Sequence, residues 1–245
     1  MDSAGLDPRR GGAHLPIMTM IADKHRAAAL ATVAGGIRPS RRGVLTATLM
    51  GGAALLLPGT AAAALLPTPR QMEGPFYPPT LPLDSDADLL QVAGRSGQAQ
   101  GTPTHVLGRV LDAAGRPIAG TRIEIWQCDA FGVYHHPRSP GAADPNFQGF
   151  GATLADADGA FRFRTIRPVP YPGRTPHIHF AVLLPGGERF TTQMYVAGEP
   201  QNDRDILLSR VRDAAERARL IVPLAPAEGL EAGALIGRFD IVLAA

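Results

Sequence analysis

The sequence predicts an all-β domain: a β-sandwich of mixed and antiparallel strands joined by loops, with one surface helix towards the C-terminal end. Short segments with alternating apolar side chains recur along the chain, and residues 160–165 show the alternation most strictly. Turns rich in glycine and aspartate separate these segments, as at residues 112–115 and 156–159. Many short strands at such spacing are typical of sandwich folds.

Six strands and one helix are expected from these patterns. In one strand segment, for example, Ile123 and Ile125 fall on the same face, because side chains alternate along a strand. The expected strands span residues 105–111, 121–126, 160–165, 177–184, 189–195 and 236–243. Residues 203–220 carry the one helical pattern, an apolar stripe flanked by arginines. This pattern predicts a surface helix over one end of the sandwich.

The chain has three predicted parts. A length of 245 residues suits one sandwich domain with a leader. Residues 1–64 are predicted to be a disordered leader that ends in a signal peptide, residues 65–103 a proline-rich arm, and residues 104–245 the sandwich. The formal net charge of +2 is uneven, because residues 1–64 hold 7 of the 24 basic and 3 of the 22 acidic residues. The remainder, with 17 basic and 19 acidic residues, offers no basic surface for nucleic acid.

The leader carries the pattern of a twin-arginine export signal. Arg41 and Arg42 precede an apolar run over residues 44–57, and alanines at 61–64 supply the small residues of a cleavage site. The apolar run is too short and too rich in glycine for a good membrane span, which disfavours the alternative of a retained anchor helix. We therefore expect a protein exported by the twin-arginine pathway, periplasmic or extracellular, with no stable membrane insertion after cleavage.

Two histidines and two tyrosines mark a candidate metal site. His177 and His179 are spaced i, i+2, so both imidazoles lie on one face of a strand. Imidazole suits zinc, copper, iron and nickel, so this pair alone does not identify the metal. Tyr134 and Tyr171 narrow the choice, because a phenol becomes a ligand only when a strongly Lewis-acidic ion such as ferric iron removes its proton. Four such ligands leave one position open on a five-coordinate ion.

Other side chains with ligand chemistry are expected to have ordinary roles. His105 is expected to be half-exposed at the start of a strand, and His135 and His136 are expected to lie on a solvated loop. Tyr77 has proline neighbours and is expected to be a packed aromatic side chain. Cys128, the only cysteine, cannot form an internal disulfide and is expected to be a half-buried, inert thiol.

Three stretches resemble one enzyme family. Residues 125–134, Ile-Trp-Gln-Cys-Asp-Ala-Phe-Gly-Val-Tyr, resemble the first-tyrosine motif of the intradiol ring-cleavage dioxygenases, which are the protocatechuate 3,4-dioxygenases and the catechol 1,2-dioxygenases. Residues 165–180 are similar to that family's segment with the second tyrosine and the two histidines, and residues 191–195 to the strand that follows. The resemblance covers residues 73–205, and four ligands in matching order make it specific.

The resemblance implies an enzyme that opens an ortho-dihydroxybenzene between its two hydroxyl-bearing carbons with O2, giving a cis,cis-muconate-type product. It also implies a non-haem iron(III), Fe(3+), held by Tyr134, Tyr171, His177 and His179. It further implies that Tyr171 leaves the metal and accepts a proton when substrate binds, that Arg174 stabilises negative charge on the ring, and that Gln193 positions the substrate.

Two other functions are weaker alternatives. Residues 108–125 resemble transthyretin-like sandwich modules that are not catalytic, but such modules have no need of two histidines and two tyrosines. A zinc hydrolase would need a third histidine or carboxylate at zinc spacing and a nearby general base, which the sequence lacks. The enzyme interpretation is therefore preferred.

The chain also departs from the family pattern. The catechol-specific enzymes carry an N-terminal helical dimerisation domain, whereas the arm here is short and rich in proline, which favours the protocatechuate-like single-domain form. Those enzymes pair two different sandwich chains. The expected partners are therefore a small aromatic diol, O2, and either a second copy of this chain or a paired sandwich chain, and the substituents of the ring stay open.

Overall fold

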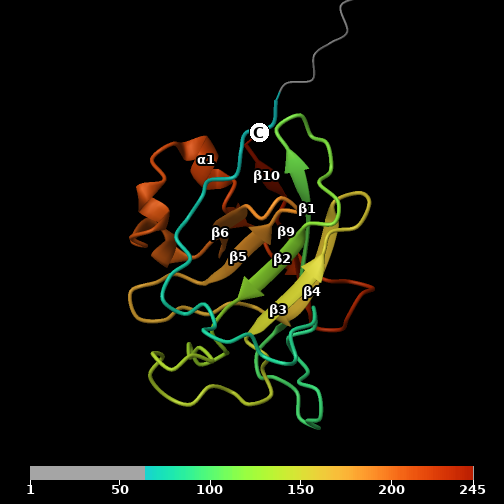
Figure 1. Cartoon of the computed structure of the whole chain (residues 1–245). Helices are drawn as coiled ribbons and strands as arrows, with labels where there is room; N and C mark the ends of the chain where they lie inside the picture. The colour runs from blue at the N-terminus through green and yellow to red at the C-terminus, as the bar shows by residue number, and fades with distance from the viewer. Residues whose placement is uncertain (1–63, 245) are drawn as a thin grey trace, which may run out of the picture. The chain divides into compact units, whose positions relative to one another are not determined.

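The computed structural model describes residues 64–244, which form a sandwich of two five-stranded sheets (Figure 1). One sheet contains β1 (Pro103–Asp112), β4 (Ala160–Ile166), β8 (Ala225–Pro226), β9 (Leu235–Arg238) and β10 (Ile241–Leu243). The other runs in the order β3 (Phe150–Leu154), β2 (Arg122–Trp126), β5 (His177–Leu183), β6 (Arg189–Val196) and β7 (Ile221–Val222). The predicted all-β sandwich is confirmed. The predicted signal peptide lies outside the described residues.

Strand β1 organises the first sheet. It pairs antiparallel with β4 on one side and in parallel with β9 and then β10 on the other. The predicted strand 236–243 is therefore wrong as one strand, because Phe239 and Asp240 separate β9 from β10. The Asp240 carboxylate accepts a hydrogen bond from the Arg109 N–H at 2.9 Å, which replaces a ladder bond at this break.

Strand β3 was not among the predicted strands. It pairs antiparallel with β2, and the arm crosses it closely at Gly151. A Cβ atom at Gly151 would lie 2.5 Å from both the Asp86 carbonyl oxygen and a methyl carbon of Leu89. The glycine that makes room for the arm also weakens the strand pattern in the sequence, because glycine is depleted in strands.

The core lies between the two sheets. Side chains of β4 and β5 that point inwards meet there, with ring centroids 6.2 Å apart for Phe161 and Phe180 and 5.0 Å apart for Phe180 and Phe239. Buried aromatic rings supply much of the apolar area that stabilises such a core. Strand β5 is buried on both faces. Its other face, which begins with His177 and His179, is therefore also closed off from water.

The predicted helix over residues 203–220 is wrong in its extent. The structure has two 3-10 turns, η1 (Pro200–Asp203) and η2 (Leu208–Arg210), and then a short helix, α1 (Ala214–Ala218). The Asp205 carboxylate accepts hydrogen bonds from the N–H groups of Leu207 and Leu208, and such local bonds compete with a continuous helix. No helix among residues 64–244 is long and apolar enough to cross a membrane.

The predicted arm, residues 65–103, runs along both sheets as a loop. Its Thr68 N–H donates to the Val242 carbonyl at 2.8 Å, and its Gln71 N–H donates to the Thr191 carbonyl at 2.9 Å. Further along, Leu89 is fully buried in the core. The arm is therefore fixed to the sandwich by backbone hydrogen bonds, and it passes over the end of the sheet where His179 lies.

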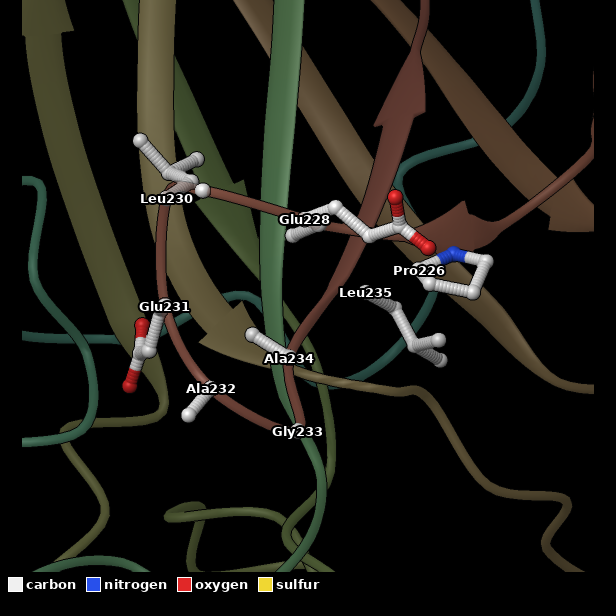
Figure 2. A pocket seen from close by; sticks show the side chains of 10 residues that line it. Pro226, Glu228, Leu230, Glu231, Ala232, Gly233, Ala234 and Leu235 are labelled. Carbon is white, nitrogen blue, oxygen red and sulfur yellow. The ribbon is translucent and has the colours of Figure 1, made fainter.

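A charged network joins the first sheet to the loop between β8 and β9. The prediction that His105 is half-exposed is wrong: it is buried, with its Nε2 atom 2.8 Å from a Glu231 carboxylate oxygen. Arg164 donates two hydrogen bonds to Glu231, at 2.7 and 2.9 Å, and two to Asp88 at 3.0 Å. The Arg164 hydrogen bonds lower the pKa of Glu231 to about 2. Figure 2 shows Glu231 and Glu228 on opposite sides of this loop.

We expect Glu231→Gln to lower the melting temperature by a few degrees at neutral pH, because Arg164 and His105 lose a charged partner. The folded-state pKa is depressed, so this contribution is complete above pH 4.5 and is lost as the pH falls towards 2. The difference in melting temperature between Glu231→Gln and wild type should therefore shrink as the pH falls from 4.5 towards 2. Glu228→Gln, on an exposed residue of the same loop, is the control. Equal melting temperatures of the two variants at pH 7 would contradict the prediction.

Candidate active site

The first three residues of strand β5 bring two histidines together. His177 and His179 are each 1% exposed, and their Nε2 atoms lie 3.1 Å apart on the face opposite Ile178. The strand pairing places Trp126 of β2 beside His179, and the two rings stack with centroids 4.9 Å apart and an interplanar angle of 8°. The pleat therefore fixes two converging ring nitrogens in a dry site, as the i, i+2 spacing predicts.

Both imidazoles are neutral, as metal ligands must be, and a hydrogen bond fixes the tautomer of His177. The Nδ1 atom of His177 lies 2.7 Å from the Thr175 carbonyl and donates its proton there, which leaves Nε2 with a free lone pair. Burial, together with the nearby charge of Arg174, lowers the pKa of His177 to about 3. Burial also lowers the pKa of His179 well below its usual range. Both rings are therefore neutral at neutral pH, which metal ligation requires.

Tyr134 reaches the same place from the loop that follows β2. The Asp129 side chain fixes this loop, because one carboxylate oxygen accepts from the N–H groups of Phe131 and Val133, both at 2.9 Å. The Tyr134 ring stacks on Phe76 of the arm with centroids 4.5 Å apart. Its hydroxyl is buried and has no hydrogen-bond partner among the described residues. A buried hydroxyl without a hydrogen-bond partner destabilises the fold unless a bound ion, water or ligand interacts with it.

Tyr171 completes the group from a turn that precedes β5. The Arg174 N–H donates to the Tyr171 carbonyl at 2.9 Å and closes this turn. The Tyr171 ring lies 5.5 Å from the Tyr134 ring and 5.4 Å from the His177 ring, and the Tyr134 ring lies 6.2 Å from that of His179. The four side chains from three separate segments therefore form one closed cluster.

This cluster fits a metal ion of the kind that binds phenolate. Burial raises the pKa of Tyr134 and Tyr171, so a strong positive charge is needed to remove their protons. The unpartnered Tyr134 hydroxyl and the facing Nε2 atoms of His177 and His179 are the groups that such an ion would satisfy. Among residues 64–244, no group of three or more His, Cys, Asp or Glu side chains gathers to offer a competing site.

Arg174 stands beside Tyr171 at the edge of the cluster. Its side chain is 11% exposed, and its Nη1 atom donates to the Tyr171 hydroxyl oxygen at 3.3 Å. Its Nη2 atom donates to the Gln193 side-chain oxygen at 2.6 Å, and its Nε atom donates to Asp205 at 2.8 Å. The guanidinium is thereby held in one orientation, with a positive charge next to the phenol oxygen.

Gln193 connects Arg174 to the arm. Its amide nitrogen donates to the Met72 carbonyl at 3.0 Å, while its amide oxygen lies 3.1 Å from the Tyr195 hydroxyl oxygen. Tyr195 in turn donates to the Gln71 side chain at 2.6 Å. Gln193 is fully buried, and both ends of its amide contact protein groups. These contacts favour a role in fixing Arg174 and the arm.

Asp205 is a functional candidate that the sequence interpretation missed. Its carboxylate is completely buried and binds Arg174, the Thr175 N–H at 3.1 Å, and the N–H groups of Leu207 and Leu208 at the start of η2. Although burial favours the neutral acid, hydrogen bonds from the Leu208 N–H and Arg174 outweigh it and hold the pKa of Asp205 below its usual value. The only sequence signal was an aspartate at the start of a helical pattern, which also occurs at ordinary helix caps.

The arm crosses the cluster with a glycine at the point of contact. Gly74 has a φ of +79°, and a Cβ atom there would lie 3.2 Å from Cε1 of His179. Tyr77 is a packed aromatic, as predicted: its ring meets Trp126 edge-on at 5.0 Å, and its hydroxyl donates to Glu124 at 2.9 Å. The arm therefore forms the cover of the site, and Tyr77 is directed away from the four-residue cluster.

The remaining sequence candidates lie around the cluster. His135 is exposed, as predicted, while the His136 ring lies 5.7 Å from that of Phe76. Cys128 is fully buried, where the sequence predicted a half-buried thiol. Burial raises the pKa of Cys128 to about 12, so the thiol stays protonated and unreactive, in line with the predicted inertness.

Fold and site together define a β-sandwich with a buried donor set of two imidazoles and two phenols. Residues 72–245 match a family model described as dioxygenase. The protocatechuate 3,4-dioxygenase beta chain of Burkholderia cepacia is 40% identical over 168 residues, which cover 64% of this chain and 71% of that one. A hydroxyquinol 1,2-dioxygenase of Corynebacterium glutamicum is 32% identical over 197 residues, covering 70% of this chain and 62% of that one.

A solved structure agrees with these matches. The dioxygenase domain of a dioxygenase carbohydrate-binding protein fusion from Streptomyces sp. SirexAA-E aligns with a TM-score of 0.55 and 34% identity, over 73% of this chain and 98% of that chain. The chain belongs to the intradiol dioxygenase family and is an oxidoreductase of that kind.

If Asp205 orients Arg174, Asp205→Asn should lower kcat for diol cleavage about tenfold to a hundredfold, because the guanidinium loses its charged anchor. Asp203→Asn, which changes an exposed neighbouring residue, is the control, and its kcat should be close to that of wild type. The test is a double-mutant cycle with Arg174→Ala, measured by oxygen uptake. The double variant should be no slower than Arg174→Ala alone. Losses that simply multiply would show that Asp205 does not act through Arg174.

Proposed function

We propose that the protein is a non-haem iron(III) dioxygenase that uses O2 to open a catechol-type ring between its two hydroxyl-bearing carbons. The product would be a cis,cis-muconate-type diacid. One observation carries the proposal: Tyr134, Tyr171, His177 and His179 converge in one cluster, in which the buried Tyr134 hydroxyl has no partner among the described residues and the Nε2 atoms of His177 and His179 face each other. The names of the relatives, a protocatechuate and a hydroxyquinol dioxygenase, support a substrate of the aromatic diol class.

The four side chains of the cluster would hold the iron. Bound ferric iron would supply a Lewis acid that binds the deprotonated diol and draws electron density from its ring. The two imidazoles are neutral and the two phenols lose their protons on binding the ion, so the donor set brings two negative charges to a trivalent cation. Trp126, stacked on His179, and Phe76, stacked on Tyr134, would keep water from this centre.

The two tyrosines have different surroundings, which supports different roles. Tyr134 is 4% exposed and packed beneath Phe76, so it is suited to a permanent ligand. Tyr171 is only half-buried and lies on a turn between two prolines, with Arg174 donating to its oxygen. Tyr171 is therefore the side chain suited to move aside for substrate and to take up a hydroxyl proton at its own oxygen.

Arg174 provides a fixed positive charge where the ring would lie. Arginine keeps its proton at any working pH, and Asp205 and Gln193 hold its fork in place before substrate arrives. Preorganised charge of this kind stabilises negative charge that develops on a substrate. Gln193 would assist by holding Arg174, and the arm through Met72, in position.

Oxygen uptake by iron-loaded protein tests this function. We expect consumption of one O2 per diol with catechol, 3,4-dihydroxybenzoate or hydroxyquinol, appearance of a muconate-type product, and loss of activity after iron removal. Tyr134→Phe should lose most of its iron and its activity, because a buried ligand is gone. Tyr77→Phe, on a nearby tyrosine directed away from the cluster, should keep both. No uptake with any of these diols by iron-loaded wild type would overturn the proposal.

We also propose that the protein is exported by the twin-arginine pathway to the periplasm or beyond and acts with a second sandwich chain or copy. The motif at Arg41 and Arg42 and the naming of the Burkholderia relative as a beta chain support these points. Changing Arg41 and Arg42 to lysine should leave the protein in the cytoplasm, whereas Arg38→Lys should not. Cell fractionation measures where each variant accumulates. Secretion that persists without the twin-arginine translocase would contradict export by this route.

A further inference from the structure

The arm turns sharply where it covers the four-residue cluster. This turn spans residues 73–77, and we call it the strap. Its Gly74 lies against His179, because a Cβ atom on that glycine would be 3.2 Å from Cε1 of the imidazole. Its Phe76 stacks on Tyr134 with ring centroids 4.5 Å apart. The strap therefore covers one imidazole and one phenol of the proposed metal site.

One arginine of strand β6 holds both ends of the strap. The Nη2 atom of Arg189 lies 2.8 Å from a carboxylate oxygen of Glu73, at the first end. At the second end, the guanidinium carbon of Arg189 lies 4.3 Å from the centroid of the Tyr77 ring, and Nη1 donates to the Tyr77 hydroxyl oxygen at 3.4 Å. An ion pair and a cation over an aromatic face are both attractive contacts. Because both ends bind the same side chain, the strap is closed against the sheet.

A buried carboxylate lies beneath this arginine. Glu124 of β2 is 2% exposed, and one of its oxygens accepts from the Tyr77 hydroxyl at 2.9 Å while the other accepts from Nε of Arg122 at 2.9 Å. The Nη1 atom of Arg189 lies 3.7 Å from the same carboxylate. The group thus has two cations for its two carboxylates, Glu73 and Glu124. Among the described residues, Arg122 pairs with Glu124 and not with the strap, so Arg189 is the cation that joins the strap to the sheet.

The strap also packs against the ring that stacks on His179. Tyr77 meets Trp126 edge-on with centroids 5.0 Å apart, and Trp126 stacks on His179 at 4.9 Å. Trp126 is 1% exposed, and it is the only tryptophan in the sequence. An outward movement of the strap would take Tyr77 off Trp126 and Gly74 off His179 together. Water would then reach both the indole and the imidazole.

We propose that Arg189 is a positioning residue that clamps the strap over the metal ligands, and that this clamp sets how slowly the site releases its metal. The inference rests on the proposed function of the four-residue cluster as an iron site. Arg189 acts through Glu73 and Tyr77, which flank the residues that cover the cluster. Without the clamp the strap would open more often, and each opening would expose ligand atoms to water and chelators.

Quenching of tryptophan fluorescence by acrylamide measures the strap without iron or turnover. In metal-free mature protein, the quenching constant of Trp126 should rise about threefold in Arg189→Ala, because opening exposes the indole. Arg189→Lys should recover part of the protection, since it keeps the charge but not the planar group over Tyr77. Arg122→Ala is the matched control: it removes the other cation on Glu124, so the melting temperature should fall while the quenching constant stays near wild type. No rise in Arg189→Ala, or an equal rise in Arg122→Ala, would overturn the inference.

Glu73→Gln tests the same ion pair from the strap and leaves strand β6 intact. Its quenching constant should rise in the same direction as that of Arg189→Ala, because the first end of the strap loses its charged contact. The double variant should be quenched no more than Arg189→Ala alone, since both changes remove one interaction. Effects of the two changes that simply multiply would show that Glu73 and Arg189 do not act together.

Iron release links the clamp to the metal site. Iron-loaded Arg189→Ala should lose its iron to a chelator about tenfold faster than wild type, whereas Arg122→Ala should lose it at the wild-type rate. If iron-loaded wild type consumes no diol but the quenching constants differ as expected, the proposed reaction fails and the clamp stands. If diols are consumed but Arg189→Ala matches wild type in both quenching and iron release, the clamp fails and the reaction stands.

Discussion

The site depends on the pleat of β5, which places two imidazoles side by side in a dry environment. His177 and His179 emerge on one face, and the opposite face carries Ile178 and Phe180 into the core between the sheets. A shift of one residue in the register of β5 would turn both histidines into the core. The same hydrophobic pattern that holds the sandwich together therefore also fixes the geometry of the donor pair, while Trp126 locks the ring of His179.

Around this pair, loops supply the groups that a strand cannot. Tyr171 and Arg174 come from one turn. The Arg174 guanidinium is held by Asp205, which lies on a different segment and also accepts hydrogen bonds from N–H groups at the start of η2. The arm then closes the site, with Gly74 lying against His179. The rigid sandwich carries the histidines, and the loops carry the groups that must adapt to substrate, which is the usual division in enzymes.

The parts that the sequence predicted are those with local or periodic signals. The i, i+2 spacing of His177 and His179 places them correctly, since a strand has a period of two. Contacts over long sequence separations were missed: Asp205 anchors an arginine 31 residues away, and His105 is buried by a glutamate 126 residues away. The helix predicted over 203–220 failed because side-chain bonds to the backbone outweigh its apolar periodicity, and periodicity alone does not register that competition.

Titration of ferric iron into metal-free mature protein tests the central claim most directly. If the four-residue cluster is the metal site, each chain should bind one iron, develop a visible phenolate-to-iron absorption band, and show a high-spin ferric EPR signal. His179→Ala, which removes one converging nitrogen, should lose the band. A protein that stays colourless with iron and instead retains one zinc per chain would contradict the account.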